Sequence, residues 1–513
     1  MAESANVGSP GLPQPSNEPL NLTRRRLLAG AGAAAVLLDP AGLRAQAPSP
    51  TAVVFSHTSV VTGDTVRDDV ALAVEGNMIA AIGPTDAVLK SYPRAEVYDG
   101  RGKALFPGLI NCHAHLAATI ERGFNEDFGF PNSWHLAINP NSLLSKEETT
   151  LMITVGALEN LRAGGTTVVQ VAGNIASSAP SLAQIGMRMV FAESIGDKEG
   201  PAGAMSPELF EQSQAPKFSE KMREEGMQRI QDLHSAWHGK NNGRITVFPA
   251  AGLAESCSPE LLHDVRDFAE KHDLGYTIHL CQTYAEADYM LKFHGYRPAE
   301  YLAAHEFLGP RLFAAHCRYP NDSEIALLGR SGTIVSHQAC MAGNRGVIPP
   351  IPALRDAGCT IAHGTDNNAN DIFEVMRVAL ITERVRRNDA TPGLRPQPED
   401  MLADSTQGGA RATRQSKYLG TLEVGKKADI LVLDTQRMHL VPAMRIVSAW
   451  IHNGQPSDIE SIMVDGQFVM RDRKILTMDE AAIVKEANAV GKRVWSKVLG
   501  AGPVTIPVRS HQI

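Results

Sequence analysis

The spacing of hydrophobic positions differs between the two ends of the chain and its middle. From Ala52 to Val97, and again over residues 418–478, short runs rich in Val and Ile alternate with polar positions and are broken by Gly, Asp and Asn. Such alternation is typical of strands in an antiparallel sheet. The turn at Val464-Asp465-Gly466 indicates a hairpin. We expect residues 48–103 and 418–478 to form one small β-sandwich domain, built from both ends of the mature chain.

Between these regions, apolar strand-like runs alternate with long amphipathic stretches of helical period, which predicts repeated βα units. Eight strands are predicted, at residues 104–111, 166–171, 188–193, 244–250, 275–280, 311–316, 332–336 and 359–365. Eight such units indicate an α/β fold, a (β/α)8 barrel over residues 104–417, with a C-terminal helix and tail at 479–513. In that barrel the working residues lie at the carboxyl ends of the strands and in the loops that follow.

Five residues that could bind a metal ion stand at four of these strand ends. His113 and His115 end the first strand, and their spacing places both side chains on one face. His279 ends the fifth strand, His316 ends the sixth, and Asp366 follows the eighth in the segment AHGTD. A single residue of this kind is more often structural or a helix cap. Five at four strand ends favour a metal site.

Several segments together resemble one known superfamily. In chain order they are LFPGLINCHAHLAATIERG, TIHLCQT, FAAHC, AHGTDNNANDIFEVMR and YLGTLEVGKKADILVLD. They are similar to the amidohydrolase superfamily, particularly its branch of triazine hydrolases, guanine and cytosine deaminases and adenosine-analogue deaminases. The resemblance runs from about residue 52 to residue 480. It implies that His113, His115, His279 and Asp366 bind one divalent metal ion, zinc first and iron as the alternative, and that His316 contacts the metal-bound water.

The chemistry of the residues agrees with that implication. Imidazole and carboxylate groups suit zinc, and an open coordination position lowers the pKa of bound water from about 15.7 to about 7. Asp366 then serves as general base, while His316 orients the hydroxide or polarises the substrate. We therefore expect a metal-dependent hydrolase of carbon–nitrogen bonds other than peptide bonds. Its expected substrate is a small N-heterocyclic or cyclic amide compound, attacked by metal hydroxide as in deaminases and chlorohydrolases.

The number of metal ions is also suggested by the resemblance. Relatives with two ions usually bridge them with a carboxylated lysine on the fourth strand, and the segment RITVFPAAGLA has no lysine. This favours a single ion. Glu193, near the end of the third strand, could bridge a second ion, but a hydrogen-bonded loop acid is the favoured interpretation.

The residue three places after His279 departs from the family pattern. Deaminases of the branch carry a glutamate there, and this chain has Gln282, whose amide offers hydrogen bonds but no titratable proton. Gln282 remains a catalytic candidate. Its lack of a titratable proton makes an amide, carbamate or dipeptide hydrolase the alternative function. Glu286 or Asp288 could supply the acid if the loop folds back, although YAEADYMLKFHG predicts a helix with both acids on its solvated face. Cys281 and Glu286 are candidate pocket residues.

A second departure lies in the segment SHQACM at residues 336–341, where the family commonly shows histidine, cysteine, proline and a Ser-Asn pair. His337 either lines the substrate pocket or is a buried structural histidine. His363 lies three residues before Asp366, so strand alternation points it away from the metal. We interpret His363 as structural.

The composition of the chain limits the kinds of molecule that it can bind. The 513 residues are 43% hydrophobic and 20% charged with a net charge of -7, which fits a globular protein, and no basic block lies beyond the N-terminus. We expect a small-molecule substrate and no nucleic acid; a homo-oligomer is left open. The six cysteines form no C-x-x-C pair, so we expect buried thiols rather than a zinc ribbon or redox motif.

The first 47 residues have the features of a targeting signal. The segment TRRRLL at residues 23–28 precedes an uncharged run to Leu38 and the segment AQA at residues 45–47, as in a twin-arginine export signal with its cleavage site. The uncharged run is shorter than the roughly 20 residues that a membrane span needs. We expect a periplasmic or secreted protein without a stable membrane span after cleavage. A non-catalytic periplasmic binding protein on this scaffold is the alternative from another class.

Overall fold

The computed structural model of the protein describes residues 52–501, apart from residues 64, 125, 127–135, 201–209, 368 and 392–394. The predicted export signal at residues 1–47 and the end of the predicted C-terminal tail lie outside the described residues. Within the described ranges, no helix combines the length and the apolar character that crossing a membrane requires.

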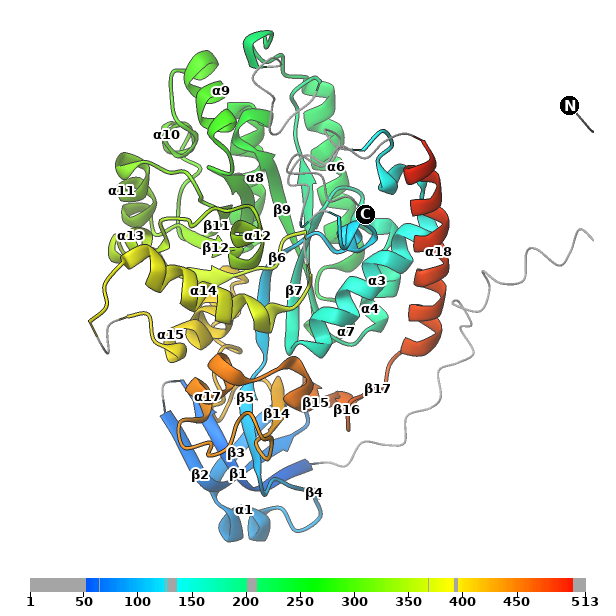
Figure 1. Cartoon of the computed structure of the whole chain (residues 1–513), viewed down its shortest axis with the longest axis vertical. Coiled ribbons are helices and arrows are strands. Elements are labelled where there is room, and N and C mark those ends of the chain that lie inside the picture. The colour runs from blue at the N-terminus through cyan, green and yellow to red at the C-terminus, as the bar shows by residue number, and fades with distance from the viewer. Residues whose placement is uncertain are drawn as a thin grey trace, which may run out of the picture. The chain divides into compact units, whose positions relative to one another are not determined.

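Eight strands form one parallel sheet in the order β13-β12-β11-β10-β9-β8-β7-β6 (Figure 1). They are β6 (Leu109–Ala114), β7 (Gly165–Ala172), β8 (Arg188–Ile195), β9 (Ile245–Leu253), β10 (Tyr276–Leu280), β11 (Leu312–His316), β12 (Ile334–His337) and β13 (Ile361–His363). Each overlaps a strand predicted from the sequence, so the predicted (β/α)8 barrel is confirmed.

The first and last strands close the barrel through a few bonds at their carboxyl ends rather than through a full ladder. Ala114 and Asp366 form an isolated parallel bridge. The N–H groups of Thr365 and Asp366 donate to the His113 carbonyl, and the His115 N–H donates to the Asp366 carbonyl. Gly364 makes this approach feasible, because a Cβ there would lie 2.9 Å from the Cβ and backbone nitrogen of His113. The closure therefore fixes the two strand ends that carry three of the candidate ligands.

Helices follow the strands and surround the sheet, as repeated βα units require. The main ones are α3 (Lys146–Arg162), α4 (Ala179–Gln184), α6 (Glu220–Trp237), α8 (Pro259–Lys271), α9 (Tyr284–His294), α10 (Pro298–Ala304), α11 (Asp322–Ser331), α12 (Ala339–Asn344), α13 (Ile351–Asp356) and α14 (Ile372–Arg387). Local sequence sets where several begin: Ser145 and Glu148 form a capping box at α3, and Ser258 caps α8 before Pro259. The predicted C-terminal helix is α18 (Glu480–Gly500).

The small β-sandwich domain is built from both ends of the described chain, as predicted. Its sheet runs in the order β17-β16-β15-β14-β5-β1-β2-β3, with β4 paired to β1. The strands are β1 (Ala52–Thr62), β2 (Thr65–Glu75), β3 (Met78–Pro84), β4 (Glu96–Asp99), β5 (Lys103–Pro107), β14 (Ile430–Asp434), β15 (Ile459–Val464), β16 (Gln467–Arg471) and β17 (Lys474–Ile475), with helices α1 (Thr85–Ser91) and α17 (Ile446–Asn453). The predicted hairpin joins β15 to β16, and Asp465 and Gly466 both have positive φ, as its tight turn requires.

One predicted strand is divided between the two domains. The sequence predicts a single first barrel strand at 104–111, but its first half is β5, which pairs with β14 in the small domain, and only its second half is β6. The break falls at Pro107 and Gly108. Proline cannot donate to a ladder, and a Cβ on Gly108 would lie 2.1 Å from the Thr166 hydroxyl. The domain boundary is therefore a few residues later than predicted.

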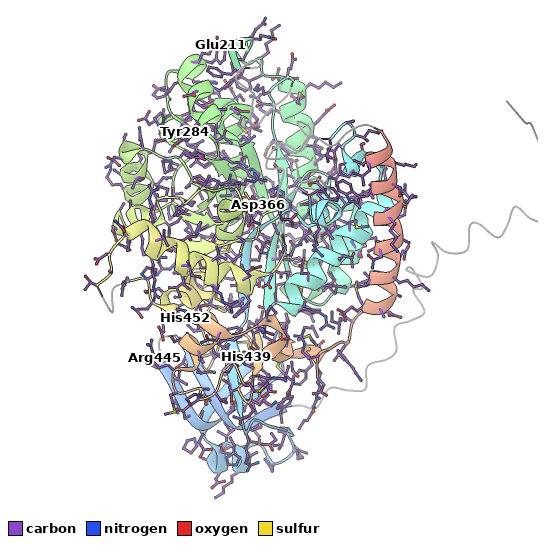
Figure 2. The ribbon with its side chains drawn as sticks, viewed as in Figure 1. Glu211, Tyr284, Asp366, His439, Arg445 and His452 are labelled. Carbon is purple, nitrogen blue, oxygen red and sulfur yellow. The ribbon has the colours of Figure 1, made fainter. Side chains whose placement is uncertain are left out.

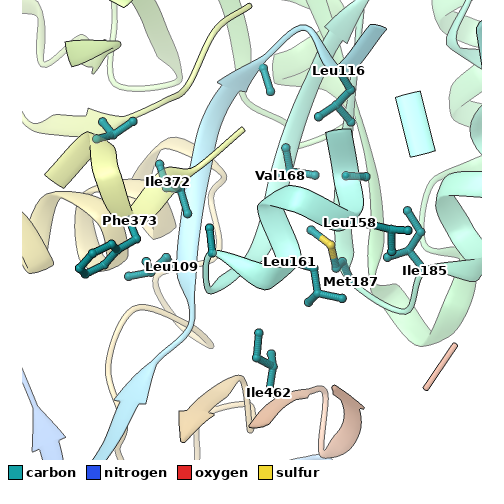
Figure 3. Packing of buried hydrophobic residues seen from close by; sticks show 14 of the residues in the cluster. Leu109, Leu116, Leu158, Leu161, Val168, Ile185, Met187, Ile372, Phe373 and Ile462 are labelled. Carbon is teal, nitrogen blue, oxygen red and sulfur yellow. The ribbon is translucent and has the colours of Figure 1, made fainter. Parts of the chain in front are cut away.

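The buried core is continuous from the barrel helices to the small domain (Figure 3). Phe106 of β5 and Phe373 of α14 contact the Trp450 ring from α17, with ring centroids 4.6 and 4.8 Å apart. The buried Arg188 of β8 also binds Asp429 and Asp465 of the small domain. These contacts join the base of the barrel to the small domain, away from the carboxyl ends of the strands.

Candidate metal centre

The structure brings the five predicted metal-site residues together at the carboxyl ends of the barrel strands. His113 is in β6 and His115 follows it, His279 is in β10, His316 ends β11, and Asp366 follows β13. Figure 2 shows Asp366 inside the barrel, far from the labelled side chains of the small domain. His316 and Asp366 have φ values of 77° and 63°, conformations that turn the chain sharply at the strand ends and that concentrate at functional sites.

The ligand atoms converge closely. His115 Nε2 lies 3.2 Å from His279 Nε2 and 3.4 Å from Asp366 Oδ1, and His113 Nε2 lies 3.7 Å from the same oxygen. Ligands about 2.0–2.1 Å from a zinc ion in tetrahedral geometry are separated by similar distances. The groups His113-His115-His279 and His113-His316-Asp366 each keep their ligand atoms within 4.8 Å of one another.

Hydrogen bonds at the outer nitrogens settle which ring atoms face the centre. His115 Nδ1 lies 2.8 Å from the Val171 carbonyl, and His279 Nδ1 lies 2.7 Å from the Gly252 carbonyl. A carbonyl only accepts, so Nδ1 carries a proton on both rings, and the neutral form of each ring presents an Nε2 lone pair. Two lone pairs 3.2 Å apart repel each other unless a cation lies between them. This arrangement fits a metal ion and does not fit an ordinary hydrogen bond.

Burial keeps His113, His279 and His316 in the neutral form that binds metal. Burial, with the neighbouring His115, lowers the pKa of His279 to about 4, and burial lowers the pKa of His113 and of His316 well below the usual value. Both ring nitrogens of His113, Nε2 of His316 and Oδ2 of Asp366 are buried without a hydrogen-bond partner among the described residues. Neutral imidazoles and unpaired buried acceptors are what a divalent cation would satisfy.

Supporting residues hold the ligands in place. The Asn111 side chain donates to Asn160 and to the Thr365 hydroxyl, and it accepts from the N–H groups of His113 and Thr365. The His316 N–H donates to Gln338 Oε1 at 2.9 Å. Neither Asn111 nor Gln338 was predicted from the sequence to support the site. The available signal was Asn111 itself, a polar residue between the apolar Ile110 and Cys112 and two positions before the ligand His113.

The segment after His279 differs from its prediction. Helix α9 forms and Asp288 is exposed, but Glu286 is buried and accepts from the backbone N–H groups of Cys281 and Gln282, at 3.2 and 2.6 Å. The prediction of a solvated Glu286 was wrong, because the loop folds back and the carboxylate caps the end of β10. Burial raises the pKa of Glu286 to about 8. The Cys281 thiol faces Glu324 at 3.5 Å, so the structure places it outside the histidine cluster.

Three other predicted residues are now placed. His363 Nδ1 bonds the Ser405 hydroxyl at 2.8 Å, which supports the structural interpretation. Glu193 accepts from the N–H groups of Asn174 and Ile175 and pairs with Arg229, which supports the interpretation as a hydrogen-bonded acid. His337 is buried at the end of β12, and neither ring nitrogen has a partner among the described residues. The six cysteines are free thiols, and five are buried.

Arg318 lies beside the cluster and was missed in the sequence. Its side chain is 4% exposed, and its Nη2 lies 3.3 Å from His316 Nδ1 and 3.9 Å from Asp366 Oδ2. The available signal was an arginine two residues after a strand-end histidine. Strand periodicity could not show where its side chain points, because His316 and Cys317 both have positive φ and β11 has already ended.

Comparisons with known proteins agree with this fold and site. The amidohydrolase family profile matches residues 104–469, and a profile of the bacterial imidazolonepropionase-like composite domain matches residues 71–95. A 5-methylthioadenosine/S-adenosylhomocysteine deaminase of Desulforudis audaxviator is 30% identical over 85% of this chain and 97% of its own. A 5'-deoxyadenosine deaminase of Methanobrevibacter smithii is 30% identical over 81% and 92%.

Two solved structures share the fold. A zinc-bound adenosine deaminase from Xanthomonas campestris superimposes with a TM-score of 0.74 at 24% identity, over 88% of this chain and all of that chain. Atrazine chlorohydrolase from Arthrobacter aurescens TC1, complexed with zinc, superimposes with a TM-score of 0.75 at 21% identity, over 86% of this chain and all of that chain.

Proposed function

The chain belongs to the amidohydrolase family and hydrolyses carbon–nitrogen bonds other than peptide bonds, and we propose that it replaces an exocyclic substituent of an N-heterocycle with a hydroxyl group from water. The observation that carries this proposal is the pair of Nε2 lone pairs of His115 and His279, 3.2 Å apart, beside Asp366. A divalent cation between the two nitrogens would be bound by both lone pairs. When bound, a divalent ion would lower the pKa of water and polarise the bond under attack.

The ion we propose is zinc, held by His113, His115, His279 and Asp366. Nitrogen and oxygen donors of this kind suit zinc. The outer Nδ1–H groups of His115 and His279 are fixed by carbonyls, which orients the rings and raises their basicity as ligands.

Asp366 and His316 are placed to handle protons and charge at the reacting carbon. Asp366 Oδ2 has no hydrogen-bond partner among the described residues, so it is free to accept a proton from the attacking water. The Nδ1 atom of His316 faces the Arg318 guanidinium, which can only donate, so His316 carries its proton on Nε2. His316 therefore acts as a hydrogen-bond donor to the substrate, and Asp366 is the base.

The leaving group separates two candidate functions. Gln282 can orient a substituent by hydrogen bonds, but it cannot protonate a departing amine. Removal of an amino group from a ring, as performed by the deaminases that this chain resembles, then needs another proton source. Hydrolysis of an amide or carbamate of the same size is the second candidate, favoured specifically by the neutral Gln282.

A direct assay distinguishes these candidates. The full chain loaded with one equivalent of zinc is offered adenosine, 5-methylthioadenosine, S-adenosylhomocysteine, 5'-deoxyadenosine, chlorinated triazines, N-acyl amino acids and carbamates, with products identified by mass spectrometry. We expect hydrolysis of a ring substituent that is absent in Asp366→Asn and in metal-free protein. Hydrolysis of only the amides or carbamates would select the second candidate. Tight binding without any turnover would favour a non-catalytic binding protein.

We also propose that the chain is exported by the twin-arginine route and works in the periplasm or outside the cell. The support is the sequence TRRRLL at residues 23–28 followed by the uncharged run and AQA. Cell fractionation tests it: the wild type should appear in the periplasm or medium in a shortened form, and Arg24→Lys combined with Arg25→Lys should remain full-length in the cytoplasm. A full-length cytoplasmic wild type would contradict export.

A further inference from the structure

Arg318 is a buried cation whose surroundings leave it incompletely paired. It follows β11 by two residues, and its guanidinium donates to His316 Nδ1 and to the Met341 sulfur from α12. Its Nε is buried and has no hydrogen-bond partner among the described residues. No hydrogen bond joins Arg318 to a carboxylate in the described parts of the chain, and the nearest carboxylate oxygen, Asp366 Oδ2, is 3.9 Å away.

An arginine in this position keeps its charge. An arginine guanidinium stays protonated at neutral pH. A buried charge without full compensation costs several kcal/mol, and such charges mark functional sites more often than structural ones. A ligand that completes the pairing would recover part of that cost.

The charged groups around Arg318 favour a bound anion once a divalent ion is present. Arg345, at the end of α12, is a second, half-buried cation that acts on Arg318 through its charge, and both guanidinium groups interact with Asp366. Glu121 faces Arg345 and also accepts from Asn141. Two cations thus stand near three carboxylates, Asp366, Glu121 and Glu286, and a bound divalent ion would make the sum of these charges positive. The neutral Gln282 does nothing to offset it.

We propose that Arg318 determines the substrate class of this site by binding an anionic oxygen, such as a carboxylate, carried by the heterocycle beside the reacting carbon. The proposal rests on the proposed function. The Arg318 guanidinium lies beside both His316 and Asp366. An anion that it binds therefore lies next to the atoms that react. The unpaired Nε offers one charge-assisted N–H donor to a carboxylate oxygen, since Nη2 already donates to His316 and to Met341.

Binding of two matched probes tests this without requiring turnover. Pyrimidine-4-carboxylate and pyrimidine-4-carboxamide have nearly the same shape but differ in charge, and their dissociation constants are measured by calorimetry on the zinc-loaded full chain. We expect the wild type to prefer the carboxylate. Arg318→Gln should weaken carboxylate binding by about 10- to 100-fold and carboxamide binding by less than about 3-fold, as loss of a charge-assisted hydrogen bond predicts.

Two further variants separate recognition from folding. Arg318→Lys keeps the charge without the Nε–H donor and should retain part of the preference. Arg311→Gln removes an arginine at the opposite end of β11, where it binds Asp273, and should leave both dissociation constants unchanged. If Arg318→Gln folds poorly, Arg318→Lys carries the test, because a carboxylate preference as large as that of the wild type in this variant would overturn the role of the guanidinium.

The outcomes are distinct from those of the turnover assay. Equal affinity of the wild type for the two probes, binding of neither probe, or a carboxylate preference that survives Arg318→Gln would overturn the role of Arg318, even if ring substrates are hydrolysed. The last result would show that the carboxylate binds the metal alone. A carboxylate preference lost in Arg318→Gln, with no ring substrate hydrolysed, would retain the anion site and reject the proposed reaction.

Discussion

Replacing Asn111 by leucine should destabilise the protein by about 4 kcal/mol. The Asn111 side chain makes four hydrogen bonds, to Asn160, to the Thr365 hydroxyl, and from the N–H groups of His113 and Thr365. A buried hydrogen bond contributes about 0.5–1.5 kcal/mol, so four contribute about 2–6 kcal/mol. Leucine has a similar size but leaves two buried N–H groups without this acceptor. Because these bonds join β6 to the end of β13, the variant should also bind zinc about 10- to 100-fold more weakly.

Urea unfolding of the metal-free protein and a competitive zinc titration measure the two effects separately. Asn111→Asp keeps the acceptor oxygen and should recover about half of the lost stability. Gln228→Leu removes one exposed hydrogen bond to Asp232 on α6 and should change stability by no more than about 0.5 kcal/mol. A loss below about 1 kcal/mol in Asn111→Leu, together with unchanged zinc affinity, would refute the idea that Asn111 holds the barrel closed around the metal site.

Further predictions concern the ligands, the proton supply, acid pH and the domain contact. His279→Ala should stay folded but lose bound zinc by elemental analysis; one zinc retained per chain would exclude His279 as a ligand. Gln282→Glu should increase amine release from ring substrates, and lower release would instead assign Gln282 to substrate recognition. The free energy of unfolding of the metal-free protein should fall by about 2 kcal/mol as the pH falls from about 6.5 to 4. The pKa of His279 is about 4 in the folded protein and 6.5 ordinarily, so the unfolded chain takes up the proton first. A constant free energy of unfolding in urea over this pH range would contradict this prediction. Arg188→Met should cost about 3–5 kcal/mol in the same assay by leaving Asp429 buried without its cation and Asp465 with Lys427 alone, and a loss under about 1 kcal/mol would show that Asp429 finds another partner.

Most of the fold was predictable because hydrophobic periodicity reports burial directly. All eight barrel strands were located within a few residues, since each is an apolar run between polar breaks. The division of the first strand at Pro107 and Gly108 was not predicted. An unbroken apolar run can serve two sheets in succession, and only the pairing of β5 with β14 shows where one sheet ends.

The candidate ligands were predictable because they end strands of a recognisable barrel. The residues around them were not. Glu286 has the sequence position of an exposed helical acid, but the fold of the preceding loop directs it to the backbone of Cys281 and Gln282. Arg318 lies beyond the end of β11, where alternation no longer indicates direction. Such positions depend on tertiary contacts that no local pattern encodes.

X-ray absorption spectroscopy of the full chain loaded with one equivalent of zinc tests the metal centre most directly. The structure predicts only nitrogen and oxygen neighbours at about 2.0–2.2 Å, with the multiple-scattering pattern of three imidazoles from His113, His115 and His279. This pattern should weaken by one imidazole in His115→Ala. A sulfur neighbour at about 2.3 Å, or a spectrum of hydrated zinc without imidazole scattering, would contradict it.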